Sequence, residues 1–265
     1  MTEPSASPSS WGFTPIRVGR RIQHFRQVDS TNNVAHHHAH DPANDGLIIV
    51  ADVQTAGRGR LGRSWSSPPE DGILMSLVLF PPDPLRRPAL LTILSAVAVC
   101  QTIQDTTGLN AAIKWPNDVY LRGKKVCGIL VEQSCGPGEP AAIIGIGLNV
   151  NTRAEVFAAA GLDQAGSLAM FHPQPLDRQD VFARLVACLD EAYGQALQGD
   201  LTDLEARWRW HSGLLGRQVQ LTARGETHTG RLLDLGFDGI LIVGDQGEHL
   251  GFAPEVVTEL KPLEQ

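Results

Sequence analysis

Cysteine is scarce in this sequence. Four cysteines occur in 265 residues, and no two of them stand at the CxxC spacing or at another spacing typical of metal ligands. Cys100, Cys127 and Cys188 lie in apolar stretches, where the reduced thiols of a protein core are found, and Cys135 does not. A cysteine-ligated metal centre is therefore excluded, and reduced core thiols indicate a cytoplasmic protein.

Long apolar runs and an excess of basic charge are also lacking. No apolar run reaches the length of a membrane span, and the N-terminus has no apolar signal-peptide segment, so no membrane partner is expected. Lys and Arg number 22 against 29 Asp and Glu, a net charge of −7. Nucleic-acid binding generally needs a basic surface that neutralises phosphates, so DNA is not expected as a partner.

Length and composition fit a main domain with a small addition. The chain has 265 residues, 42% hydrophobic and 19% charged, which is enough to bury a sizeable core. Residues 1–20 begin with a Ser- and Pro-rich stretch and are expected to be disordered. The main domain is expected over 21–212. From 213 to 265, short strands separated by Gly and Asp predict an all-β domain of SH3-like size.

Helix and strand signals alternate in the main domain. Capping side chains, apolar density and helical spacing predict three helices, over 31–40, 88–106 and 177–210. Apolar patterns of strand length predict strands over 46–54, 73–80, 112–114, 119–121, 126–133 and 141–150. No internal repeat accompanies this pattern, which excludes a repeat architecture.

The most informative segment is residues 56–65, AGRGRLGRSW, the glycine–arginine loop, which lies between two strand patterns. Gly57, Gly59 and Gly62 allow positive φ and a close approach of backbone N–H groups to a ligand. The alternating arginines add flat positive charge suited to carboxylate or phosphate. Disordered RGG segments that bind RNA also alternate Gly with Arg. The flanking strands and the acidic chain favour a loop that closes over a small anion.

A second candidate is the turn KWPND, residues 114–118. A lysine at the end of a strand is usually a solvated surface group. Here Lys114 is followed in the same turn by Asn117 and Asp118, whose oxygens suit Mg²⁺ or ribose beside a phosphate-binding lysine. The turn is therefore a candidate nucleotide site.

Weaker signals come from single polar residues next to strands. Residues 29–32, DSTN, cap a helix, and their hydroxyls and free N–H groups, together with Gln54, suit a polar ring. Lys125 opens the strand KVCGILVE, either as an edge charge that discourages aggregation or as a ligand contact. Asn149 ends a strand, either as a turn residue or as a hydrogen-bond partner of adenine.

A run of histidines invites interpretation as a metal site. His36 and His40 stand one helical turn apart, so both imidazoles can share a helix face. No carboxylate motif accompanies them, and the helix is expected to end at Asp41. A solvated helix face is therefore favoured, and no tightly bound metal is expected.

Taken together, five motifs resemble those of a biotin protein ligase: DSTN (29–32), GRGRLGRSW (57–65), KWPND (114–118), KVCGILVE (125–132) and GIGLN (145–149). The resemblance extends from about residue 22 to the C-terminus. It implies an α+β fold, with a mixed β-sheet flanked by helices as in class II synthetases and a small C-terminal SH3-like β-barrel. Regulatory members carry an N-terminal winged-helix domain that binds DNA. Fewer than thirty residues precede Asp29, so the short, monofunctional kind is expected.

The resemblance also implies the reaction. Biotin and ATP, with Mg²⁺, would give biotinyl-5′-AMP, and a lysine of an acetyl-CoA carboxylase-type biotin carrier protein would then displace AMP. The glycine–arginine loop is expected to order over the ligands and to exclude water from the adenylate. A homodimer is compatible with the resemblance. The alternatives are a lipoate ligase or octanoyl transferase of the same architecture, and a biotin-sensing module without turnover.

Residue roles follow from the same motifs. The resemblance implies biotin contacts for Ser30, Thr31, Asn32, Gln54, Arg58, Gly59, Arg60 and Lys125. It implies ATP or adenylate contacts for Gly57, Gly62, Trp65, Lys114, Asn117, Asp118 and Asn149. Catalytic charge stabilisation would come from Lys114, Arg60 and Lys125, and Mg²⁺ would be held by Asn117 and Asp118. The family often ends in Leu-Arg-Pro, whereas residues 260–262 read Leu-Lys-Pro, so an ATP contact from Lys261 is an open question.

Overall fold

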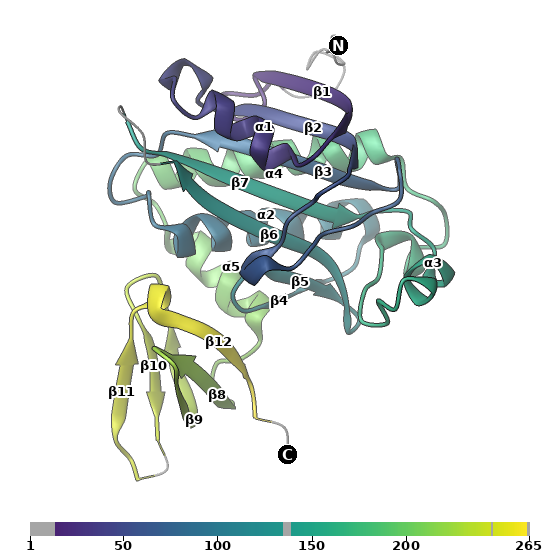
Figure 1. The fold of residues 1–265 in the computed structure, drawn as a ribbon. Coiled ribbons are helices and arrows are strands. Elements are labelled where there is room, and N and C mark those ends of the chain that lie inside the picture. The colour runs from purple at the N-terminus through teal and green to yellow at the C-terminus, as the bar shows by residue number, and fades with distance from the viewer. Residues whose placement is uncertain (1–13, 135–138, 245, 264–265) are drawn as a thin grey trace.

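The computed structural model describes residues 14–134, 139–244 and 246–263, which form two β-sheets and the helices that cover the larger one (Figure 1). Among these residues the larger sheet has seven strands, in the order β1-β2-β3-β7-β6-β5-β4. Only the β1–β2 pair is parallel, so the sheet is mixed. Its strands are β1 (Arg21–Val28), β2 (Leu47–Gln54), β3 (Gly72–Leu79), β4 (Ala112–Lys114), β5 (Asp118–Leu121), β6 (Lys124–Ser134) and β7 (Ala141–Asn149).

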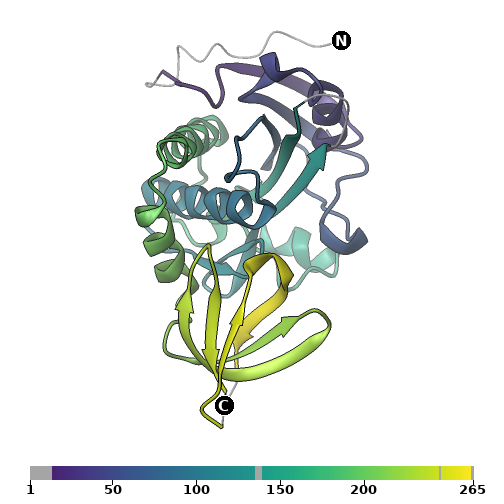
Figure 2. The ribbon, with the colours of Figure 1, turned by 90° about the vertical axis from the view of Figure 1, so that its left-hand side faces the viewer.

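Helices lie on both faces of this sheet (Figures 1 and 2). The helix α1 (Thr31–His38) packs on one face, and the other face carries α2 (Pro88–Thr107), α4 (Arg178–Leu197) and α5 (Thr202–Ser212). A short α3 (Ala154–Ala159) follows β7. Because both faces are covered, the central strands are apolar at successive positions, and every residue of β3 is buried.

Alternation along the strands assigns side chains to two separate cores. Leu47 and Ile49 of β2 pack with Ala35 of α1, whereas Ile48 points to the opposite core with Met75. Successive side chains of a strand point to opposite faces, which explains this division. The fold class expected from the family resemblance, a mixed sheet flanked by helices, is thereby confirmed.

Two element predictions need correction. The helix expected over 177–210 is two helices, because the chain leaves the helical conformation after α4, and Gly199 has a φ of +81°. Strand β1 was not predicted from the sequence. Its segment RIQHFRQV is polar because it is the edge strand of the sheet formed by the described residues, where β2 is its neighbour.

The helix α2 is the centre of the main core. It is 20 residues long and apolar enough, by length and composition alone, to cross a membrane, so the expectation that no run reaches that length is wrong. Most of it is buried inside the protein, as in the core helix of a soluble domain.

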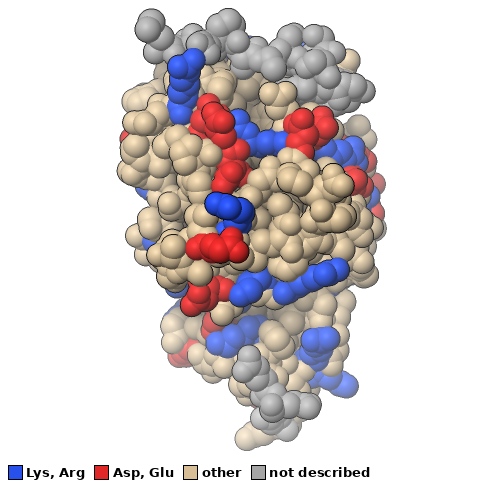
Figure 3. All heavy atoms as spheres, turned by 90° about the vertical axis from the view of Figure 1, so that its right-hand side faces the viewer, with Lys and Arg blue, Asp and Glu red and all other residues tan. Residues whose placement is uncertain are grey.

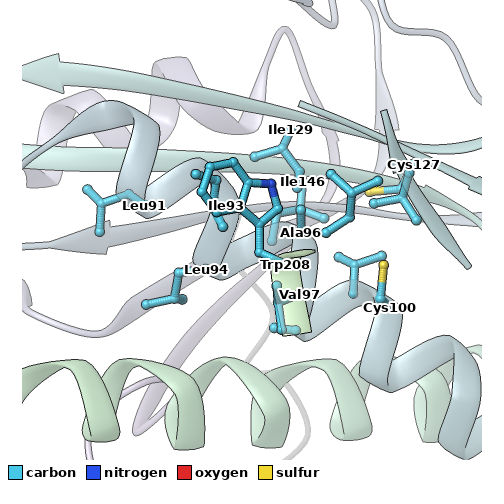
Figure 4. Packing of buried hydrophobic residues seen from close by; sticks show 14 of the residues in the cluster. Leu91, Ile93, Leu94, Ala96, Val97, Cys100, Cys127, Ile129, Ile146 and Trp208 are labelled. Atoms are coloured by element: carbon cyan, nitrogen blue, oxygen red, sulfur yellow. The ribbon is translucent and has the colours of Figure 1, made fainter. Parts of the chain in front are cut away.

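Figure 4 shows the packing of the α2 residues Leu91, Ile93, Leu94, Ala96, Val97 and Cys100 with Cys127, Ile129, Ile146 and Trp208. The thiols of Cys100, Cys127 and Cys188 are free and buried, as predicted, and Cys135 lies outside the described residues.

The second sheet packs below the first (Figure 2) and is antiparallel throughout, in the order β11-β10-β9-β8-β12. Its strands are β8 (Gln218–Ala223), β9 (Glu226–Leu235), β10 (Ile240–Val243), β11 (His249–Phe252) and β12 (Val257–Pro262). Five short antiparallel strands fit the expected SH3-like domain. Trp115 Nε1 donates to the carbonyl of Val257 at 2.9 Å, and Arg87 Nε donates to Glu255 at 2.7 Å. These contacts join the second sheet to the main domain.

Trp208 on α5 packs between the main core and the second sheet, and we expect its removal to lower the stability. Its ring is 1% exposed and lies 5.7 Å from that of Trp115 and 5.5 Å from that of Phe237. Trp208→Ala should lower the free energy of unfolding by about 3–5 kcal/mol, the usual cost of a large-to-small change in a core. Denaturant unfolding measures this. The control is Trp210→Ala, whose side chain is 59% exposed; an equal loss in both variants would contradict the prediction.

The segment expected to be disordered, 1–20, needs a partial correction. The backbone N–H groups of Ile16, Arg17 and Val18 donate to the carboxylate of Asp190 on α4 at 2.6–2.9 Å. Val18 is fully buried. These residues are therefore part of the folded domain, and residues 1–13 lie outside the described ones.

Charges of both signs are interspersed on the face shown in Figure 3, where Lys and Arg stand beside Asp and Glu. This agrees with the acidic net charge of −7.

Candidate functional site

A cavity of about 560 Å³ opens between the larger sheet, the glycine–arginine loop and the second sheet. Polar and charged side chains from separate parts of the sequence line it. Most of the predicted site residues are among them: Ser30, Thr31, Asn32, Gln54, Arg58, Gly59, Arg60, Trp65, Lys114, Asn117, Asp118 and Lys125. The structure thus brings residues of all five sequence motifs to one cavity.

The N-terminus of α1 forms the polar end of the cavity. Ser30 is at the N-cap position, and its side chain makes no capping hydrogen bond. Thr31 donates to Gln54 Oε1 twice, from its N–H at 2.7 Å and from its hydroxyl at 3.0 Å. From β3, Ser76 Oγ lies 2.7 Å from Thr31 Oγ1 and 2.5 Å from Asn32 Oδ1. These contacts hold the polar side chains in place, as a small ring with donors and acceptors requires.

The glycine–arginine loop folds back on itself in front of β6 and β5 (Figure 1). Gly59 N–H donates to the carbonyl of Arg63 at 2.7 Å, and Trp65 N–H donates to that of Gly57 at 2.9 Å. The tip turns through two left-handed residues, Leu61 with a φ of +55° and Gly62 with +73°. The Leu61 side chain is 90% exposed. The tip of the loop is therefore a tight turn that projects into solvent.

Trp65 anchors the end of this loop on a flat seat made by two glycines. Gly128 of β6 and Gly147 of β7 are paired in register, and the indole lies against both. A Cβ at Gly147 would lie 2.4 Å from Trp65 Cε2, and one at Gly128 would lie 2.8 Å from Cζ3. Trp65 Nε1 is buried and finds no hydrogen-bond partner among the described residues. Only glycine leaves room for the ring at these positions, so the seat and the loop depend on each other.

We expect Gly147→Ala to push Trp65 from its seat and to loosen the loop. Overpacking of this kind costs about 1–3 kcal/mol, so trypsin should cleave after Arg60 about tenfold faster. Limited proteolysis followed by mass spectrometry measures the rate. Gly194→Ala on α4 is the matched control, because a Cβ there meets no atom within 4 Å. Equal cleavage rates in the two variants would show that the loop does not depend on the seat.

The hairpin of β4 and β5 presents the KWPND turn to the cavity. Asn117 is fixed to β6 by two bonds, since its carbonyl accepts from Ile129 N–H at 2.9 Å and its side chain donates to the Ile129 carbonyl at 2.8 Å. Lys114 Nζ lies 5.2 Å from the centre of the Tyr120 ring, and the lysine is otherwise exposed. Its ammonium group is therefore available to an anion in the cavity.

Positive charge predominates in this part of the cavity. Lys125 Nζ forms an ion pair with Asp118 Oδ1 at 2.7 Å, and it lies 5.6 Å from the Trp65 ring. Arg60 Nη1 is 3.5 Å from Asn117 Oδ1. Burial lowers the pKa of the Arg60 guanidinium from its usual value, and the Asp118 carboxylate opposes that shift. Arginine nevertheless stays protonated at neutral pH. With Lys114, three cations meet the carboxylate of Asp118 in this part of the cavity. An anion is therefore the complementary ligand.

Three predicted site residues do not line the cavity. Gly62 lines a neighbouring groove, and Gly57 lies within the loop against the carbonyl of Trp65. Asn149 is buried, and its amide donates to the carbonyl of Gly166 at 2.9 Å. Its Oδ1 atom is buried with no hydrogen-bond partner among the described residues, so the contact with adenine stays a prediction.

The structure adds residues that the sequence did not point to. Ser76, which holds α1, stands in a continuous apolar strand and carries no signal of its own. The second sheet contributes Thr222, Thr258 and Glu259 to the cavity lining. Lys261 does not line it; its ammonium group lies 3.1 Å from Glu259 Oε2. Only the docking of the two domains makes these contributions visible.

The histidine run on α1 lies near β6 through His36. Among the described residues, no three His, Cys, Asp or Glu side chains are arranged to hold a metal ion. His36 Nε2 lies instead 3.5 Å from Glu132 Oε2. The oxygens of Asn117 and Asp118 are of the type that Mg²⁺ prefers, and both side chains line the cavity, so this pair fits an ion that enters with a nucleotide.

Comparisons with known proteins agree with this geometry. Residues 24–151 match the biotin/lipoate A/B protein ligase family. A bifunctional ligase/repressor of Bacillus spizizenii is 34% identical over 243 residues, which are 91% of this chain and 75% of that protein. The biotin–[acetyl-CoA-carboxylase] ligase of Mycobacterium tuberculosis is 30% identical over 247 residues, which are 87% and 90% of the two chains.

A solved structure extends the likeness to three dimensions. The biotin protein ligase from Aquifex aeolicus in complex with biotin and ATP superimposes with a TM-score of 0.77 at 27% identity, over 92% of this chain and 100% of that one. The similarity therefore includes the second sheet as well as the site. The chain belongs to the biotin/lipoate A/B protein ligase family and, within it, to the biotin protein ligases.

Proposed function

We propose that this protein activates biotin with ATP and transfers it to a lysine of a biotin carrier protein. The observation that carries the proposal is the convergence of Lys114, Arg60 and Lys125 on a cavity whose other end is the polar N-terminus of α1. A carboxylate attached to a polar ring and a nucleotide phosphate would meet between these two ends. The homologous ligases support biotin and ATP as the substrates.

The first half-reaction joins two anions. A carboxylate oxygen of biotin attacks the α-phosphorus of ATP, and pyrophosphate leaves, which gives biotinyl-5′-AMP. Lys114 and Arg60 offset the repulsion between the reactants and stabilise the charge on the phosphoryl oxygens. Mg²⁺ would enter with ATP and neutralise its phosphates. If Asp118 then bound Mg²⁺, Lys125 would lose its ion-pair partner and its positive charge would also act on the phosphates. The residues act by position and charge, and no covalent enzyme intermediate is needed.

The second half-reaction consumes the adenylate. The uncharged amine of the acceptor lysine attacks the biotinyl carbonyl, AMP leaves, and the amine loses a proton as the amide forms. Water would hydrolyse the same mixed anhydride, so the cavity must stay closed until the acceptor arrives. The glycine–arginine loop, which borders the cavity, is placed to provide that closure. A carboxylase carrier domain is the acceptor that the curated relatives favour.

Transfer of labelled biotin tests this function. The full chain is mixed with biotin, a carboxylase biotin carrier domain and Mg²⁺, with or without ATP, and label on the carrier is counted. We expect labelling only with ATP, and pyrophosphate release with biotin even when the carrier is left out. The same assay with lipoate examines the alternative within the family. Labelling by lipoate and not by biotin would overturn the proposal.

A further inference from the structure

Glu132, on β6, holds a position between the glycine–arginine loop and the helix α1. Its Oε2 atom accepts from Arg58 Nη2 at 2.8 Å and from Asn32 Nδ2 at 2.7 Å. His36 Nε2 lies 3.5 Å from the same oxygen. One carboxylate oxygen thus connects the loop, the wall of the cavity and the sheet.

Glu132 lies next to the cavity rather than in its lining. Arg58 and Asn32 line the cavity of about 560 Å³, whereas Glu132 does not. It lines the neighbouring groove of about 610 Å³ on the other side of the loop. Glu132 therefore contacts two residues of the cavity lining without being part of that lining.

The loop has few other polar contacts with the rest of the protein. Near its tip, the bonds from Gly59 N–H to Arg63 and from Arg63 N–H to Arg60 stay within the loop. The contact from Arg60 to Asn117 spans 3.5 Å, at the limit of a hydrogen bond. The pair of Arg58 and Glu132 is 2.8 Å long and charge-assisted. Ala56, at the start of the loop, also donates its N–H to the carbonyl of Asp29 at 2.8 Å. Of the two side-chain contacts named here, the pair of Arg58 and Glu132 is the shorter one and ties the loop to β6.

The hydrogen bond from Asn32 to Glu132 strengthens the ion pair between Glu132 and Arg58. The same Asn32 side chain packs on Gly145, where a Cβ would lie 2.4 Å from Asn32 Oδ1. Asn32 is 4% exposed, so its amide needs a buried acceptor, and Glu132 supplies it. Because Asn32 fixes the carboxylate, the carboxylate is already oriented when it meets Arg58. Less side-chain entropy is then lost when this ion pair forms than with a free surface pair.

We propose that Glu132 is a positioning residue, which holds the glycine–arginine loop against β6 through Arg58 and thereby retains the adenylate until the acceptor arrives. This inference rests on the proposed function for its consequence, and on the contacts above for its geometry. Removing the negative charge should free Arg58 and the loop while the cavity wall stays intact.

The substitution Glu132→Gln separates the two contacts. The glutamine oxygen can still accept from Asn32, whereas the charge that attracts Arg58 is lost. We expect biotinyl-5′-AMP, formed on the enzyme and then chased with unlabelled biotin and ATP, to leave about five- to tenfold faster, as for a partly exposed charge pair fixed by a third group. The affinity for biotin alone, measured by calorimetry, should stay within about twofold of wild type because the wall residues are unchanged. The control is Glu226→Gln in the second sheet, whose side chain is 81% exposed.

A double-mutant cycle identifies the partner. Arg58→Ala should also speed adenylate release, and Arg58→Ala with Glu132→Gln should be no faster than Arg58→Ala alone, because the two changes remove one interaction. Additive effects, or release from Glu132→Gln at the wild-type rate, would overturn the proposal. Trypsin cleavage after Arg63 in the ligand-free protein adds a readout independent of catalysis, and Glu132→Gln should raise its rate. If wild type forms no adenylate, the proposed function fails, while the cleavage rates still decide whether Glu132 holds the loop.

Discussion

Lys114→Ala should abolish adenylate formation while biotin still binds. The ammonium group lies at the end of β4, lines the cavity and has no carboxylate partner within the described residues, so its charge is free to act on a phosphate. Loss of one fixed donor aimed at developing charge costs about 100- to 1,000-fold in rate. ATP–pyrophosphate exchange in the presence of biotin measures the first half-reaction, and calorimetry measures biotin binding.

The control for this variant is Lys124→Ala. The Lys124 ammonium group donates to the carbonyl of Asp163, and Lys124 does not line the cavity. The substitution Lys124→Ala removes one positive charge near the cavity without changing a residue that lines it. ATP–pyrophosphate exchange should therefore persist in this variant. If exchange survived in Lys114→Ala at a rate near that of wild type, Lys114 would not be the group that stabilises the phosphoryl charge.

Arg60→Gly is expected to let the adenylate escape. Arg60 is half-buried in the loop and points to the KWPND turn, 3.5 Å from Asn117 Oδ1, so a bound anion would meet its guanidinium in a partly desolvated place. Hydrogen bonds to charged groups are worth about 1.5–3 kcal/mol. Release of biotinyl-5′-AMP should therefore speed up about ten- to hundredfold, measured by chase of labelled adenylate.

Arg60→Lys separates charge from shape at this position. Lysine keeps the positive charge but has no planar fork, so it should recover part of the retention. A second consequence checks the role of the loop, since escaped adenylate would biotinylate lysines of unrelated proteins in the same tube. If the Arg60→Gly variant retained biotinyl-5′-AMP as well as wild type does, Arg60 would not be the residue that holds the adenylate in the cavity.

The elements that could be predicted from the sequence are those with a strong local pattern. The helix α2 and the strands β2, β3 and β7 carry long apolar stretches, since α2 is a core helix and both faces of the sheet are covered. The polar edge strand β1 and the break between α4 and α5 escaped prediction. An edge strand is defined by its neighbour, and the break depends on where two helices pack. Both features depend on tertiary packing, which a short stretch of sequence does not reveal.

The same division runs through the site. Short-range chemistry made the glycine–arginine loop and the turn around Lys114 recognisable, because Gly, Arg, Lys, Asn and Asp have distinct ligand preferences wherever they stand. The sequence by itself therefore determined the class of ligand, an anion with a polar ring. Only the tertiary structure decided that Glu132 holds Arg58, that Asn149 supports the loop around Gly166, and that Glu259 borders the cavity. Each of these is a contact between distant segments, and burial and distance exist only once the chain has folded.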